Sequence, residues 1–311
     1  MAASPSAAEP IRFTGTGDVR VGPLEDRIGE LRALDYRCGG GSCLDDVLTL
    51  IHRVSRDTAA TGDRAGAAVA DLHSLAGWAS FDIGLVNRAH VHFAQALVIA
   101  GEGRNSCQVA DILYRMGQVR LHHGDPAGAL EFFQIGQVAA GPECALESSI
   151  LFMSQAWAHA VMGSELNARA MMDRGAERFA ESGTEPPSWA GFFTGNDMLA
   201  MVGTVHTELA RRVDPRHVRV AIPALTQASD GYGDDMARSR TFSLIMLSMN
   251  LLADGDVDHG VAIGMRALAA AETLSSLRVR DRMHPLKADA DLHGTHPGAR
   301  DLAARIAART S

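Results

Sequence analysis

Five positions at fixed spacing recur four times along this 311-residue chain. In one copy Gly117 is followed by Gly124, Ala129, Phe133 and Gly136, at offsets of 7, 5, 4 and 3 residues. Small residues at helical spacing let two helices approach closely, and the large residue fills the space between them. Each copy therefore predicts an antiparallel helix pair with a glycine in its turn. The other copies are Gly77, Gly84, Ala89, Phe93 and Ala96; Ala156, Gly163, Ala168, Met172 and Gly175; and Ser248, Gly255, Gly260, Gly264 and Ala267.

The spacing between the copies predicts a helical repeat. The third position of the pattern recurs at separations of 40, 39 and 92 residues. Ala221, Leu225 and Ala228 divide the largest gap and mark a fifth unit that contains an insertion. No segment alternates apolar and polar residues as a half-buried strand would. We therefore predict an all-α fold, an α-solenoid of five to six helix pairs.

One repeat domain is predicted over residues 24–309. Residues 1–23 are rich in Ala, Ser, Pro and Gly without periodicity, which predicts a flexible arm. Apolar residues at helical spacing begin at Leu24. The Pro and Gly content of residues 182–197 predicts an inserted loop, and such loops often carry function. Residues 278–309 are polar and interrupted by Pro and Gly, which predicts a solvated capping segment that ends in a short helix.

Charge and cysteine content limit the function classes. The net charge of −8 opposes attraction to phosphate backbones and anionic lipid, so we expect no direct nucleic-acid binding. The sequence has no secretory signal and no apolar run of about 18 residues, which predicts a cytoplasmic protein without a membrane segment. In that compartment we expect four free thiols, at Cys38, Cys43, Cys107 and Cys144.

The repeat pattern resembles the tetratricopeptide repeat. Residues 113–142, LYRMGQVRLHHGDPAGALEFFQIGQVAAGP, carry its signature most clearly, although the units here are longer than the family's 34 residues. The stretches LRALDYRCGGGSC, PPSWAGFF and SLRVRDRMHPL are similar to the C-terminal repeat region of actinobacterial helix-turn-helix transcriptional regulators. That resemblance implies a sensor or dimerisation role. It does not carry over DNA binding, because about 23 residues precede the first predicted helix, too few for a helix-turn-helix domain.

The inner face of the predicted array is the candidate binding surface. Two of the three tryptophans fall at the same position of different repeats, and the third lies in the predicted loop. Aromatic side chains contribute strongly to binding, so we expect a groove for a peptide, a partner protein or a small ligand. The alternative is that the tryptophans only pack between repeats. The predicted binding residues are Trp78, Tyr114, Gln118, His122, Met153, Trp157 and Trp189.

Histidine and arginine clusters are interpreted as structural, and we expect no metal and no cofactor. His90 and His92 diverge on a helix, and His122 and His123 are placed to interact with a helix end. A third group is expected to be solvated and comprises His284, Asp289, Asp291, His293 and His296. Surface ion pairs are expected for Arg211, Arg212, Arg216, Arg219, Arg278, Arg280 and Arg282.

These features favour a binding and regulatory protein, linked by the resemblance to transcriptional regulation. None of the common catalytic motifs is present, so no catalytic residue is assigned. The alternative is an enzyme, or an essential enzyme subunit, of a specialised biosynthetic pathway. Its chemistry would be assembled inside the array from residues such as His122, Tyr114 and Asp82. A third hypothesis is homodimerisation through a terminal repeat.

Overall fold

Every element of the described chain is helical. The computed structural model describes residues 21–56 and 62–310, which contain fourteen α-helices and three short 3₁₀ helices. The predicted all-α fold is therefore confirmed. Of the predicted flexible arm, residues 1–20 lie outside the described ranges, and residues 21–23 already belong to the first helix.

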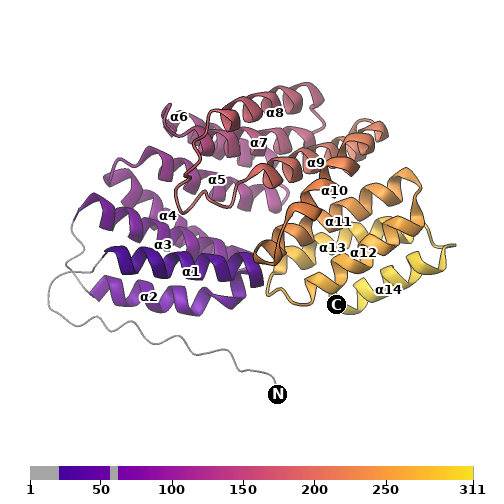
Figure 1. The fold of residues 1–311 in the computed structure, drawn as a ribbon, viewed down its shortest axis with the longest axis horizontal. Coiled ribbons are helices and arrows are strands. Elements are labelled where there is room, and N and C mark those ends of the chain that lie inside the picture. The colour runs from indigo at the N-terminus through magenta and orange to yellow at the C-terminus, as the bar shows by residue number, and fades with distance from the viewer. Residues whose placement is uncertain (1–20, 57–61, 311) are drawn as a thin grey trace, which may run out of the picture.

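The α-helices follow one another in antiparallel pairs, as in a helical repeat (Figure 1). The first helix of each pair also packs against the first helix of the next pair. The first helices are α1 (Val21–Cys38), α3 (Asp63–Asp82), α5 (Ser106–His122), α7 (Ala145–Val161), α9 (Gly195–Arg212), α11 (Ala237–Asp254) and α13 (Leu277–Asp291). The second helices are α2 (Leu44–Arg56), α4 (Val86–Glu102), α6 (Pro126–Ala139), α8 (Glu165–Ala180), α10 (Val218–Gly231), α12 (Val257–Ala271) and α14 (Pro297–Thr310). The 3₁₀ helices are η1 (Gly40–Ser42), η2 (Pro215–His217) and η3 (Asp234–Met236).

The repeated glycines have the two roles that the sequence predicts. The turn glycine of each copy has a φ between 74° and 90°, in the left-handed region that only glycine adopts easily. In the first two copies the first position also needs the absence of a side chain, because a Cβ on Gly77 would lie 2.7 Å from Phe93 and one on Gly117 would lie 2.3 Å from Phe133 of the paired helix. The four turn glycines are Gly84, Gly124, Gly163 and Gly255.

The fifth unit keeps the same packing with a longer connection. A Cβ on Gly203 of α9 would lie 2.4 Å from Leu225 of α10, so these two residues take the small and large positions of the pattern. The helix η2 between them adds residues and hides the offset from a sequence search. A capping box between Thr194 and Asp197 starts α9 at Gly195, so the inserted loop ends at residue 194 rather than 197.

The C-terminal segment is not a solvated cap. It forms the seventh helix pair in the described ranges, whereas five to six were predicted, and α13 packs against α11. Val279, Met283 and Leu286 of α13 are buried at 2% exposure or less. Pro285 lies inside this helix. Proline disfavours a helix interior, and here the tertiary packing of the apolar face overcomes that local effect.

Two of the four cysteines form a disulfide, which contradicts the prediction of four free thiols. Cys107 and Cys144 are bonded, whereas Cys38 and Cys43 are free. Cys107 lies in the first turn of α5, and Cys144 immediately precedes α7. Their separation of 37 residues is about one repeat, so equivalent ends of neighbouring repeats bring the two sulfur atoms together. The repeat length was therefore a signal for this pairing.

The two ends of the array meet. Helix α1 lies beside the α11–α13 region, although more than 180 residues separate them in the chain (Figure 1). The amide of Gly41 donates to the carbonyl of Ser275 at 3.1 Å, and the amide of Ser275 donates to the carbonyl of Cys38 at 2.8 Å. The first helices therefore surround a central space.

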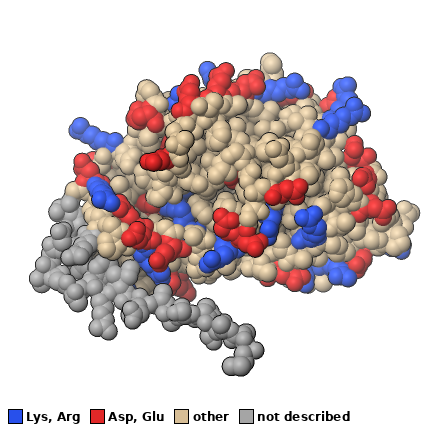
Figure 2. Space-filling view, viewed as in Figure 1, with Lys and Arg blue, Asp and Glu red and all other residues tan. Residues whose placement is uncertain are grey.

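Acidic and basic side chains are interspersed on the outer face shown in Figure 2. Arg211, Arg212 and Arg216 form ion pairs with Asp289, Glu208 and Asp214, as predicted. Within the described ranges, none of the helices has both the length and the apolar character required to cross a bilayer.

We expect the disulfide to stabilise the fold. A double Cys107→Ala, Cys144→Ala variant should lose about 2–4 kcal/mol of unfolding free energy, because the bond restricts the unfolded chain. Urea denaturation of both proteins measures this loss, with Cys38→Ala as the matched control at a free cysteine. Dithiothreitol should destabilise the wild type and leave the double variant unaffected. Equal stability of the two proteins would contradict a structural role for the bond.

A buried histidine pair should make stability depend on pH. The Nδ1 atoms of His206 and His217 lie 2.9 Å apart, and burial, followed by the charge of His217, lowers the pKa of His206 to about 4. The unfolded chain binds a proton at this ring below pH 6.5, whereas the folded protein does so only near pH 4. The unfolding free energy should therefore fall by on the order of 1–2 kcal/mol between pH 7 and pH 5. His206→Gln should reduce this slope in urea titrations, and an unchanged slope would show that His206 does not contribute.

Candidate functional site

A cavity of about 170 Å³ lies at the centre of the array. Each of the seven first helices contributes to its wall, and in the described ranges no second helix does. The wall is rich in aromatic side chains. It contains all three tyrosines of the chain, two of the three tryptophans and four of the ten phenylalanines. The tyrosine and tryptophan side chains of the chain are therefore concentrated around this one cavity, and aromatic linings are common in ligand pockets.

Five of the seven predicted binding residues line this cavity: Trp78, Tyr114, Gln118, His122 and Trp157. They reach it from α3, α5 and α7, as expected for the inner helices of a repeat. The structure brings them together around one central cavity between the first helices of the repeats. The tryptophans also pack between repeats, so the two interpretations of these residues describe the same side chains.

The other two predicted residues lie outside the cavity wall. Met153 is fully buried against α8, where a Cβ on Gly175 would lie 2.7 Å from its sulfur. The indole nitrogen of Trp189 donates to Glu147 at 3.0 Å, and its carbonyl accepts from Arg115 at 3.1 Å. Trp189 therefore holds the inserted loop against the array. From that loop, Phe192 and Phe193 reach the cavity instead.

The prediction of surface ion pairs is wrong for two arginines of α13, Arg278 and Arg282. Arg278 and Arg282 lie four residues apart on one face of the helix, and both line the cavity. The guanidinium carbon of Arg278 lies 4.4 Å from the ring centre of Trp78, and that of Arg282 lies 4.8 Å from Trp157. Both are also within 5.6 Å of the Phe242 ring. Recognising α13 as a helix would have revealed this face.

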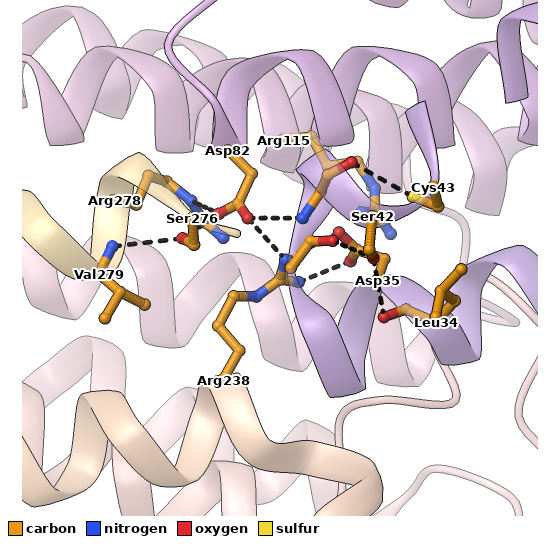
Figure 3. A network of polar contacts seen from close by, with 12 residues as sticks. Leu34, Asp35, Ser42, Cys43, Asp82, Arg115, Arg238, Ser276, Arg278 and Val279 are labelled. Atoms are coloured by element: carbon orange, nitrogen blue, oxygen red, sulfur yellow. Dashed lines mark hydrogen bonds and ion pairs between the residues drawn. The ribbon is translucent and has the colours of Figure 1, made fainter. Parts of the chain in front are cut away.

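A buried ion cluster joins the two ends of the array beside the cavity (Figure 3). Arg238 of α11 donates to both oxygens of Asp35 at 2.8 and 2.6 Å and to Asp82 at 3.1 Å. Arg278 donates to Asp82 at 2.7 Å. The amide of Gly40 and the hydroxyl of Ser276 also donate to Asp82, at 2.8 and 2.9 Å. Two carboxylates and two guanidinium groups thus balance in charge.

The pKa of Asp82 reflects this cluster. Burial alone raises the pKa of this carboxyl, but Arg238 and Arg278 outweigh burial and lower it to about 2. Asp82 is therefore ionised at neutral pH, and its oxygens accept four donors. The carboxylate is committed to holding the fold together.

Arg282 differs from the other arginines of the cavity wall because it has no carboxylate partner within the described ranges. Glu208 interacts with it electrostatically, but pairs with Arg212 at 3.2 Å. Burial lowers the pKa of Arg282 to about 10, with Glu208 opposing and Arg278 adding to this shift. The side chain is therefore still charged at neutral pH.

Other polar groups of the wall are neutral or unpartnered. The Nε2 atom of His122 lies 3.1 Å from Oδ2 of Asp281, within hydrogen-bond distance. The ring therefore contacts α13 rather than the end of its own helix. Burial and Arg278 lower its pKa to about 4, so the ring is neutral at pH 7. The indole nitrogen of Trp157 is buried and has no hydrogen-bond partner within the described ranges. The hydroxyl of Tyr36 is also buried, and burial raises its pKa. Sequence reasoning missed Tyr36, because α1 precedes the first clear repeat.

The remaining histidine clusters do not form a shared site. His92 pairs with His73 at 3.1 Å, away from His90, as the helical spacing predicts. His293 bonds to the carbonyl of Leu252, and His296 bonds to Asp258. Within the described ranges, a single group has metal-ligand spacing, and its two sulfur atoms are bonded to each other: Cys107, Glu143 and Cys144.

No known family model matches this sequence, and comparison with curated proteins also found no match. The interpretation of the cavity therefore rests on its own geometry and chemistry.

We expect the ion cluster to be essential for stability. Asp82→Asn removes one of two buried negative charges and should cost about 3 kcal/mol of unfolding free energy, because a buried guanidinium loses its partner. Urea denaturation measures the change. The matched control is Asp301→Asn, which removes an exposed ion pair with Arg305 on α14 and should cost less than about 1 kcal/mol. Similar losses in both variants would contradict the proposed importance of the cluster.

Proposed function

We propose that this protein is a tetratricopeptide-like solenoid that binds a small molecule in its central cavity and acts as a regulatory sensor. The observation that carries the proposal is the aromatic cavity wall, to which every first helix contributes. Known ligand pockets are concave and mainly apolar, with a few polar groups that orient the ligand. The link to transcriptional regulation rests on the sequence resemblance described above.

A small ligand is favoured over a peptide or a partner protein. A partner helix would need an open concave surface along the array. Here the ends of the array are joined by backbone hydrogen bonds and by the ion cluster. The aromatic side chains on which the groove hypothesis depended face the space inside this closure.

The properties of the three candidate catalytic residues, Asp82, Tyr114 and His122, also favour binding over catalysis. Asp82 is occupied by four donors within the ion cluster. Burial raises the pKa of Tyr114 to about 12, with Arg115 opposing this rise and Asp111 adding to it, which makes the hydroxyl a weak proton donor. His122 is engaged by Asp281. None of these groups combines a free position with a pKa near neutrality, as acid–base catalysis requires.

Titration with N-phenyl-1-naphthylamine (NPN), an uncharged aromatic fluorophore, tests the cavity. We expect saturable binding of one molecule per chain. Ala200→Trp places a large side chain at the cavity wall and should weaken binding at least about tenfold. Ala304→Trp, at an exposed position of α14, is the matched control and should bind as the wild type does.

Circular dichroism spectra of both variants check that the fold is intact. Absence of saturable binding, or equal binding by the wild type and a folded Ala200→Trp variant, would contradict a ligand-binding cavity.

A further inference from the structure

The charges of the cavity wall are paired with one exception. Four arginines line the cavity, and three of them have a carboxylate partner. Arg115 pairs with Asp111 at 2.8 Å, Arg238 with Asp35 at 2.6 Å and Arg278 with Asp82 at 2.7 Å. Arg282 has no such partner in the part of the chain that the structure describes. The wall therefore presents one positive charge that the protein does not neutralise.

The remaining acid of the cavity wall is already committed. Asp197 accepts the hydroxyl of Tyr232 at 2.8 Å on one oxygen. Its other oxygen accepts the amide and the hydroxyl of Thr194 at 3.1 and 2.9 Å, as part of the capping box of α9. Both oxygens are thus satisfied locally. Asp197 does not supply the missing partner of Arg282.

The surroundings of Arg282 make an unpaired charge energetically unfavourable. Arg282 is only partly exposed, and its guanidinium carbon lies 4.8 Å from the ring centre of Trp157 and 5.5 Å from that of Phe242, so aromatic faces replace part of its hydration. The like charge of Arg278 acts on it as well. Stacking leaves the edge of a guanidinium group free, and this edge matches the two oxygens of an anion.

We infer that the ligand is an aromatic or otherwise flat apolar molecule with an anionic group, which pairs with Arg282. This inference rests on the proposed function. The anion would be a carboxylate, sulfonate or phosphate, since all three present paired oxygens to arginine. The apolar body would lie among the aromatic side chains of the wall, where Tyr114 and Phe192 already stack with an angle of 18° between their rings.

Two fluorophores that differ in charge test this inference. 8-Anilinonaphthalene-1-sulfonate (ANS) has the same ring system as NPN and adds one sulfonate. Arg282→Met removes the charge and keeps an apolar stem. It should weaken ANS binding about tenfold or more and leave NPN binding within about twofold. Arg280→Met, at an exposed position of the same helix, is the matched control and should change neither affinity.

A second measurement separates a binding role from a structural one. If Arg282 serves the ligand, its removal relieves an uncompensated charge, so Arg282→Met without ligand should melt at the wild-type temperature or about 2 °C or more above it. Arg282→Lys keeps the charge and should retain more ANS affinity than Arg282→Met. A lower melting temperature with unchanged ANS affinity would show that Arg282 is structural, and would overturn the inference.

The outcomes also separate this inference from the proposed function. Binding of NPN that depends on Ala200, together with ANS binding that is insensitive to Arg282→Met, would retain the cavity and reject an anionic ligand. Failure of both fluorophores to respond to Ala200→Trp would reject the cavity itself, and the inference with it.

Discussion

The contact between Arg238 of α11 and Asp35 of α1 connects two helices across a separation of 203 residues in sequence. Around it, Asp82 and Arg278 complete a charge-balanced cluster in which Asp35 and Asp82 are fully buried. The apolar cores on the two sides are separate, one within α1–α3 and the other within α10–α14. The closure is therefore made largely by directional polar contacts, which fix the relative position of the two ends more narrowly than apolar packing would.

This closure determines what the inner surface can do. In an open array, the aromatic side chains of α3, α5 and α7 would face solvent. Here Tyr114 stacks on Phe192 of the loop before α9, and Tyr36 of α1 and Phe242 of α11 line the same cavity. Trp78 is consequently 8% exposed and still lines the cavity. Arg278 takes part in both features, because it pairs with Asp82 and stacks on Trp78.

The helix pairs and their turns could be predicted from the sequence, whereas the contacts between distant helices could not. Glycines at fixed offsets were sufficient to predict helix pairs, since a turn with positive φ and a close helix contact both demand glycine. They were also sufficient to place Trp78 and Trp157 on the inner face. The periodic pattern contains no information about where the ends of the array meet. The pairing of Asp35 with Arg238 could therefore not be predicted from the sequence. Arg282 was missed because polarity was interpreted as exposure, whereas tertiary contacts leave it only partly exposed.

The unpaired state of Arg282 is difficult to explain by folding alone. Stacking on an aromatic ring stabilises a cation by about 0.5–1 kcal/mol at an exposed site and by about 2 kcal/mol or more when the cation is desolvated. Removing an ion completely from water costs several kcal/mol even after the protein relaxes, and the partial burial of Arg282 carries part of this cost. The same cavity wall pairs Arg115, Arg238 and Arg278 with carboxylates, so the fold can supply such partners where stability requires them. An arginine without one, at a wall shared by all seven first helices, is better explained by a partner that comes from outside the chain.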